Sequence, residues 1–121
     1  MTAAVIEKDG KFLVTRRPGG VHLEGLWEFP GGKCEEGESH VASLEREIIE
    51  ELDAAIVVDR EVFSVEHSYA ERVVELHFFA CRLRGEPRAV LGQEMRWVAR
   101  EELRMLPFPP ADAELIEMLS T

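Results

Sequence analysis

Three glutamates and one arginine are crowded into a short stretch of the sequence, at positions 46 to 51. Successive residues of a helix turn by about 100°, so a helix here places Glu47 beside both Glu50 and Glu51. Like charges at these spacings destabilise an isolated helix by roughly 0.2–0.5 kcal/mol per pair. Such crowding is typical of a face that binds cations, and carboxylate oxygens suit Mg²⁺ or Mn²⁺. It also raises carboxylate pKa values, which favours general-base chemistry.

The alternative interpretation is a solvated acidic face, on which Arg46 pairs with Glu50 at the i+4 position. The segment Pro30-Gly31-Gly32 ahead of the helix favours a binding site instead. Glycines leave backbone exposed, so a carbonyl there can join the carboxylates as a further oxygen ligand. We expect this segment to begin a loop that runs to about Glu38.

The helix that carries these carboxylates has a clear start signal and an apolar stripe. Ser39 is a favourable N-cap residue, and a helix is expected to follow it. Four apolar residues recur at helical spacing and predict the buried side of this helix. They are Val41, Leu44, Ile48 and Leu52.

The rest of the chain alternates strand patterns with turn signals. Asp9-Gly10 predicts a hairpin between residues 3–6 and 11–17. Further extended segments are expected at 26–29, at 55–58 and 62–69 with an interruption around Asp59-Arg60, at 72–83, and at 95–98. Residues 100–105 suggest a helical turn or two, and 113–119 an amphipathic helix. The pattern predicts a single α/β domain over residues 1–121.

Composition narrows the classes of function. The chain of 121 residues has a formal charge of −10 and shows no basic stripe, which argues against duplex nucleic acid as a partner. Cys34 and Cys81 form no C-x-x-C pair, which favours reduced thiols inside a cell. No signal peptide or membrane-spanning run is visible, so we expect a cytoplasmic protein that does not contact membranes. The sequence leaves both a monomer and a homodimer open.

The spacing of the charged segment resembles a known signature, G-x5-E-x7-R-E-U-x-E-E-x-G-U, where U is a bulky aliphatic residue. The chain supplies Gly32, Glu38, Arg46-Glu47-Ile48 and Glu50-Glu51 at the required spacing. This is the box of the Nudix hydrolase superfamily. Residues 26–33 and 108–112 resemble its MutT branch, so the likeness extends over essentially the whole chain.

The resemblance implies a fold and a reaction. The fold is an α/β/α sandwich with a mixed central sheet. The reaction is Mg²⁺-dependent hydrolysis of a nucleoside triphosphate, oxidised or canonical in its base, to a nucleoside monophosphate and pyrophosphate. Mn²⁺ can substitute for Mg²⁺, and the role is sanitation or housekeeping of the nucleotide pool. Hydrolysis of another diphosphate, such as a nucleotide sugar, and non-catalytic nucleotide binding are the alternatives.

The resemblance also implies roles for the residues of the box. Glu50 and Glu51 are expected to bind the metal, joined by the carbonyl of Gly31. Glu47 is a further ligand or the general base, and Arg46 orients it. Glu38 is expected to form an ion pair that supports the loop.

Five further residues are implied to contact the nucleotide. They are Arg17, His22, Phe29, Phe78 and Asp112. Plain core packing explains the two phenylalanines equally well, and a solvated loop position is the alternative for His22. An ionised Asp112 accepts hydrogen bonds, so it can bind the exocyclic amine of either cytosine or guanine.

The chain departs from the family pattern in three places. Asp53 replaces a glycine that ends the box helix, and aspartate tolerates the left-handed conformation better than most residues. Ala54 replaces a bulky aliphatic residue. Leu91 stands where MutT-like enzymes often carry a further metal-binding glutamate. Either Glu94 substitutes for it, or the helix carboxylates act alone.

Overall fold

Strands, two α-helices and two 3₁₀ turns make up the computed structural model, which describes residues 1–16 and 25–121. The strands are β1 (Thr2–Lys8), β2 (Lys11–Arg16), β3 (Trp27–Glu28), β4 (Gly31–Gly32), β5 (Ala55–Ser68), β6 (Val73–Arg84) and β7 (Glu94–Ala99). The α-helices are α1 (His40–Leu52) and α2 (Ala113–Ser120), with 3₁₀ turns η1 (Arg100–Met105) and η2 (Pro110–Asp112) ahead of α2.

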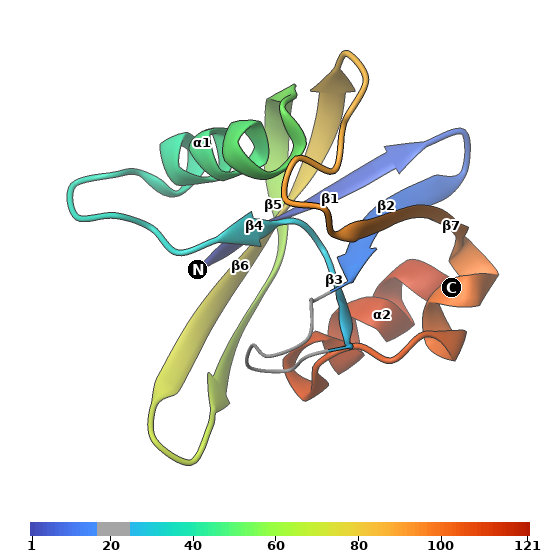
Figure 1. Cartoon of the computed structure of the whole chain (residues 1–121). Helices are drawn as coiled ribbons and strands as arrows, with labels where there is room; N and C mark the ends of the chain where they lie inside the picture. Colours follow the sequence, from blue (N-terminus) through green and yellow to red (C-terminus); the bar gives the residue numbers. More distant parts are fainter. Residues whose placement is uncertain (17–24) are drawn as a thin grey trace.

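The sheet is mixed, and helices cover both of its faces. Strand order is β3-β2-β1-β6-β5, with β4 also pairing with β1 and β7 with β2. Strands β1 and β6 are parallel, whereas the other recorded pairs are antiparallel. Helix α1 lies on one side of the sheet and α2 on the other (Figure 1). This arrangement confirms the α/β/α sandwich with a mixed central sheet.

Strand β1 separates two hydrophobic cores, because successive side chains of a strand point to opposite faces. Ala3 and Val5 pack in the core on the α2 side, with Leu115 and other apolar residues. Ala4 and Ile6 pack in the core beneath α1. Strand β1, which pairs with β4 ahead of α1, is therefore packed on both of its faces.

Local signals in the sequence account for the ends of α1 and for the first hairpin. The Ser39 hydroxyl accepts a hydrogen bond from the Ala42 amide at 3.1 Å, as expected for an N-cap. Asp53 adopts the expected left-handed conformation, with φ 51°. Asp9 and Gly10 both have positive φ, which is the geometry of a tight two-residue hairpin turn. These three predictions are confirmed.

Two predictions about packing and continuity need correction. Val41 is 41% exposed, because it lies in the first turn of α1, whereas the core beneath the helix begins at Leu44. The buried side of α1 instead includes Ser43. The expected break near Asp59 is a shift of pairing register within one continuous strand, β5. A bulge accommodates the polar residues there without ending the strand.

No helix in the described part of the chain is long and apolar enough to cross a membrane.

The corrected buried side of α1 predicts unequal effects of two truncations on the free energy of unfolding. Leu44→Ala should cost about 2–5 kcal/mol, because the residue is fully buried. Val41→Ala should cost about 0.5 kcal/mol or less, as an exposed position does. Urea unfolding of both variants measures this difference, and equal losses would return Val41 to the core.

Candidate functional site

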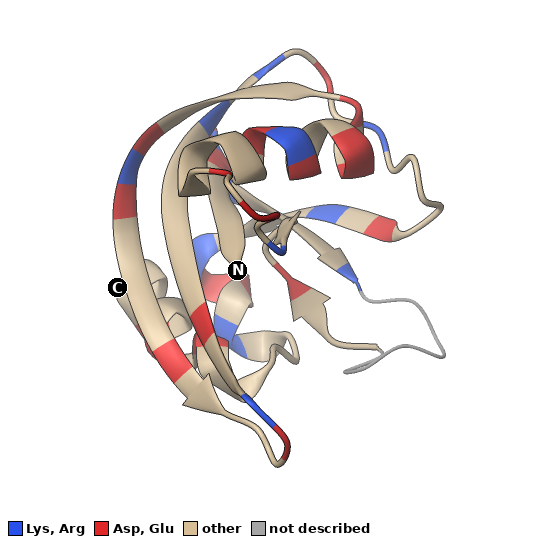
Figure 2. Ribbon diagram, turned by 90° about the vertical axis from the view of Figure 1, so that its left-hand side faces the viewer, with Lys and Arg blue, Asp and Glu red and all other residues tan. Residues whose placement is uncertain are grey.

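Arg46 connects the box helix to the loop that precedes it. Helix α1 carries four glutamates around this single arginine (Figure 2). The Arg46 guanidinium donates to both carboxylate oxygens of Glu38, at 2.8 and 2.9 Å, and to the Lys33 carbonyl at 3.1 Å. It also donates to Glu47 at 3.0 Å and to Glu50 at 3.2 Å. The expected Glu38 ion pair is confirmed, and the i+4 pair with Glu50 is present as well.

The carboxylates around Arg46 differ in their electrostatic surroundings. The hydrogen bond from Arg46 lowers the pKa of Glu38 to about 2. Burial raises the pKa of Glu47 above its ordinary value, even though Arg46 acts in the opposite direction. The Glu47 side chain is only 16% exposed, whereas that of Glu50 is 57% exposed. Glu47 is therefore the more suitable of the two to hold a proton.

The glycine pair ahead of the box is a strand rather than the start of a loop. Gly31 and Gly32 pair with Ala3 and Thr2 of β1 as strand β4, which corrects the loop prediction. A Cβ on Gly32 would lie within 2.7 Å of both carboxylate oxygens of Glu47. A Cβ on Gly31 would collide with the backbone of β1. Only glycine allows this backbone to lie directly against the carboxylates.

The second contact between β4 and α1 is a hydrogen bond. The Gly31 amide donates to Oε2 of Glu51 at 3.2 Å. Strand β4 therefore touches α1 at two carboxylates one helical turn apart, Glu47 and Glu51. Hydrogen bonding and shape together fix both side chains toward the sheet edge.

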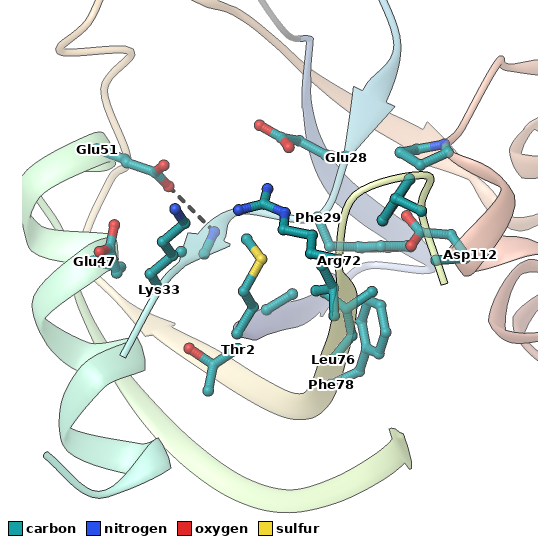
Figure 3. A pocket seen from close by; sticks show the side chains of 18 residues that line it. Thr2, Glu28, Phe29, Lys33, Glu47, Glu51, Arg72, Leu76, Phe78 and Asp112 are labelled. Atoms are coloured by element: carbon teal, nitrogen blue, oxygen red, sulfur yellow. Dashed lines mark hydrogen bonds between the residues drawn. The ribbon is translucent and has the colours of Figure 1, made fainter. Parts of the chain in front are cut away.

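A cavity of about 570 Å³ joins this carboxylate wall to an aromatic compartment. Glu47 and Glu51 line one end, and Phe29, Leu76 and Phe78 line the other (Figure 3). The volume lies within the range of about 300–1,000 Å³ that is usual for small-molecule sites. The cavity therefore offers a polar and an apolar end to a single ligand.

The structure brings most of the predicted site residues to this cavity. Gly31, Glu47, Glu51 and Asp112 line it. Phe29 and Phe78 line it too, while being only 3% and 2% exposed, so they are core and cavity wall at once.

The structure leaves other predicted site residues away from the cavity lining or undescribed. Glu50 is not among the described residues that line the cavity, and its carboxylate accepts a hydrogen bond from Arg46. The predicted contacts Arg17 and His22 lie outside the described residues.

Further residues of the wall were not predicted from the sequence. Lys33 directly follows the glycine pair, so the motif itself placed it nearby. Arg72 and Leu76 come from the β5–β6 hairpin and its return strand, and Thr2 from β1. Figure 3 shows the Arg72 side chain extending across the cavity, between the carboxylates and the aromatic end. No local pattern signals these three residues, because strand pairing brings them in.

The position expected for a further glutamate does not contribute to the described wall. Leu91 is 69% exposed, and Glu94 is engaged by Arg16 at 3.4 Å. Neither is among the described residues that line the cavity. Their loop is nevertheless tied to α1, because the Gln93 side chain donates to the Glu51 carbonyl at 3.1 Å.

Comparison with known proteins agrees with this geometry. Residues 1–118 match the model of the NUDIX domain family. The chain is 38% identical to the CTP pyrophosphohydrolase of Escherichia coli (strain K12), over 97% of this chain and 87% of that protein. It is 33% identical to the 8-oxo-dGTP diphosphatase of Buchnera aphidicola subsp. Acyrthosiphon pisum (strain APS), over 90% and 86% respectively.

A solved structure gives the same result for the fold. The MutT NUDIX hydrolase from Burkholderia pseudomallei superposes with a TM-score of 0.85 at 28% identity, over 96% of this chain and 93% of that one. The chain belongs to the NUDIX domain family. The family expected from the box spacing is therefore confirmed.

The donor set of the carboxylate wall suits a hard divalent cation. Its side-chain oxygens belong to carboxylates, and the glycine pair adds backbone beside them without side-chain bulk. In the described residues, no three His, Cys, Asp or Glu side chains converge into a ready-made cage. Arg46 instead neutralises Glu47 and Glu50. The wall therefore suits a divalent cation because it offers carboxylate oxygens that are open to the cavity, not because the oxygens already form a coordination shell.

The close approach of Gly32 to Glu47 predicts a separation of activity from stability. Gly32→Ala should fold with nearly parental stability, because the clash is with the end of a flexible side chain. Its added methyl group displaces the Glu47 carboxylate, so pyrophosphate release from a nucleoside triphosphate should fall at least tenfold, on the order expected for a misplaced catalytic group.

Gly37→Ala is the matched control. Gly37 has φ +83° and open space around it, so this change should cost roughly 1–2 kcal/mol of stability and leave turnover intact. Parental turnover in Gly32→Ala would show that the position of Glu47 does not matter.

Proposed function

We propose that this protein hydrolyses a nucleoside triphosphate to a nucleoside monophosphate and pyrophosphate, using Mg²⁺, for which Mn²⁺ can substitute. The observation that carries the proposal is a cavity that has carboxylates at one end and aromatic side chains at the other. A nucleotide has the matching polarity, with anionic phosphates joined through a sugar to a flat base. The names of the two curated relatives support the same class of substrate.

The proposed metal ligands are Glu47, Glu50, Glu51 and the carbonyl of Gly31. When bound, the divalent cation neutralises charge on phosphate oxygens and makes water a better nucleophile at neutral pH. Glu50 is included because it lies one turn from Glu47 and beside Glu51, although Arg46 holds it in this structure. Arg46 keeps the carboxylates in place and, through Glu38, holds the loop that leads to them.

Glu47 is the proposed general base, with metal ligation as its other proposed role. Its carboxylate is buried and its pKa is raised, so it can accept a proton from the attacking water. Water adds to a phosphorus of the bridge between the α and β phosphates. The bridging P–O bond of that phosphorus breaks, and nucleoside monophosphate and pyrophosphate are released. Lys33 and Arg72 line the same cavity and supply positive charge for the phosphates.

The apolar end is the proposed base site. Phe29 stacks on Phe108, with ring centroids 5.5 Å apart, and meets Phe78 edge to face at 6.2 Å. Asp112 is 6% exposed and lines this end of the cavity, where a carboxylate oxygen can accept from an exocyclic amine. We propose a cytosine or guanine base, the latter canonical or oxidised, with Arg17 and His22 as further nucleotide contacts.

Replacement of Glu50 tests the metal site against the solvated-surface interpretation. Glu50→Gln removes an anionic ligand, so turnover in Mg²⁺ should fall by roughly 100-fold or more. The free energy of unfolding in EDTA should change by about 0.5 kcal/mol or less, because Glu50 is exposed and loses only one i,i+4 pair.

Glu45→Gln is the matched control, since it removes the same charge from an exposed position of the same helix. It should keep parental turnover. Excess EDTA should abolish turnover of the parent protein. Full activity of Glu50→Gln, or turnover of the parent in EDTA, would contradict the proposed metal site.

A further inference from the structure

Thr2 is a buried polar residue without a recorded hydrogen-bond partner. It is only 2% exposed, and its Oγ1 is the one buried side-chain nitrogen or oxygen in the described part of the chain that lacks a partner. Buried hydroxyl groups in native proteins nearly always form hydrogen bonds, so an exception calls for an explanation. Thr2 also lines the cavity that holds the carboxylate wall.

The pairing of β1 places the Thr2 side chain beside Glu47. Thr2 is directly paired with Gly32 of β4, and directly paired residues carry their side chains on the same face of a sheet. On that face, the position of a Gly32 Cβ is in contact with the Glu47 carboxylate. Figure 3 shows the Thr2 hydroxyl pointing toward α1, the helix that carries Glu47 and Glu51. The unpartnered hydroxyl and the buried carboxylate therefore share one side of the sheet edge.

Two other polar side chains on this face, those of His77 and Ser43, already have hydrogen-bond partners. Thr2 is paired on its other side with His77 of β6. Both ring nitrogens of His77 contact carboxylates, Glu61 at 2.7 Å and Glu75 at 2.5 Å, so both are already engaged. The hydroxyl of Ser43, buried on α1, donates to the Lys33 carbonyl at 3.4 Å. Glu61 and Glu75 are engaged by His77, whereas the Glu47 carboxylate lines the same cavity as Thr2 and touches the Gly32 position directly opposite it. Hydrogen bonds to a charged carboxylate are stronger than those between neutral groups.

We propose that Thr2 is a positioning residue, whose hydroxyl donates a hydrogen bond to the Glu47 carboxylate when the divalent cation is bound. This inference rests on the proposed function, in which Glu47 acts at the metal site. Arg46 holds Glu47 in the present structure, and a cation competes for the same oxygens. A second donor, approaching from the sheet rather than from the helix, keeps the carboxylate oriented as that competition proceeds. Carboxylates that bind metals are generally held by such outer hydrogen bonds.

The test compares Thr2→Val, which removes the hydroxyl at nearly constant shape, with Thr2→Ser, which keeps it. The first readout is the affinity for Mn²⁺ alone, measured by calorimetric titration without nucleotide. Thr2→Val should bind Mn²⁺ at least about tenfold more weakly than the parent, and Thr2→Ser should bind it like the parent. The second readout is urea unfolding in EDTA, where Thr2→Val should be as stable as the parent or more stable, because it buries no unpartnered hydroxyl.

The outcomes separate this inference from the proposed function. Parental Mn²⁺ affinity in Thr2→Val, together with weakened affinity in Glu47→Gln, overturns the role of Thr2 alone. Parental affinity in Glu47→Gln overturns Glu47 as a metal ligand and the inference with it, whereas loss of binding in Glu50→Gln would still support the remaining metal site. Equal weakening in Thr2→Ser and Thr2→Val also overturns the inference, because the hydroxyl is then not the cause. Weakening in Thr2→Val that Thr2→Ser restores supports it.

Discussion

The backbone of Gly31 and Gly32 passes so close to β1 and α1 that a Cβ on Gly31 would collide with the backbone of β1 and one on Gly32 would displace the Glu47 carboxylate. This close approach is the constraint on which the site depends. It brings the Gly31 amide to Glu51 and packs the Glu47 carboxylate onto Gly32. It also places the Glu47 and Glu51 carboxylates in partly buried positions. Burial of a charged group is unfavourable unless a charged or hydrogen-bonding partner compensates for the lost water.

Arg46 provides that compensation for Glu47, and the Gly31 amide donates to Glu51. Arg46 binds three carboxylates and a backbone carbonyl at once, so it neutralises α1 and fixes the loop before it. As a consequence, protein groups hold the carboxylates of this helix face, and Glu47 and Glu51 present oxygen atoms to the cavity. The core on the α2 side of β1 holds the other half of the site, where Phe29 and Phe78 are both packed in the core and part of the cavity wall.

The sequence predicted those parts of the site that depend on spacing along a single helix. The box identified Glu47 and Glu51, and cap chemistry predicted Ser39 and the left-handed Asp53. Features that depend on pairing between distant strands were not predictable in the same way. Leu76 and Arg72 reach the cavity through β6 and the turn before it, and the orphan hydroxyl of Thr2 follows from its register opposite Gly32. Val41 follows the helical spacing of the buried residues of α1. This spacing alone cannot show that Val41 lies beyond the part of the helix that packs on the sheet.

The central claim is that one cavity holds the phosphates at its carboxylate end and the base at its aromatic end, so that cleavage releases pyrophosphate. Product identification by ³¹P NMR tests it most directly, with CTP, dGTP and 8-oxo-dGTP each incubated with the protein in Mg²⁺. The account predicts nucleoside monophosphate and pyrophosphate in equal amounts from at least one of these substrates. Formation of nucleoside diphosphate and orthophosphate, or no turnover of any of them, would contradict it.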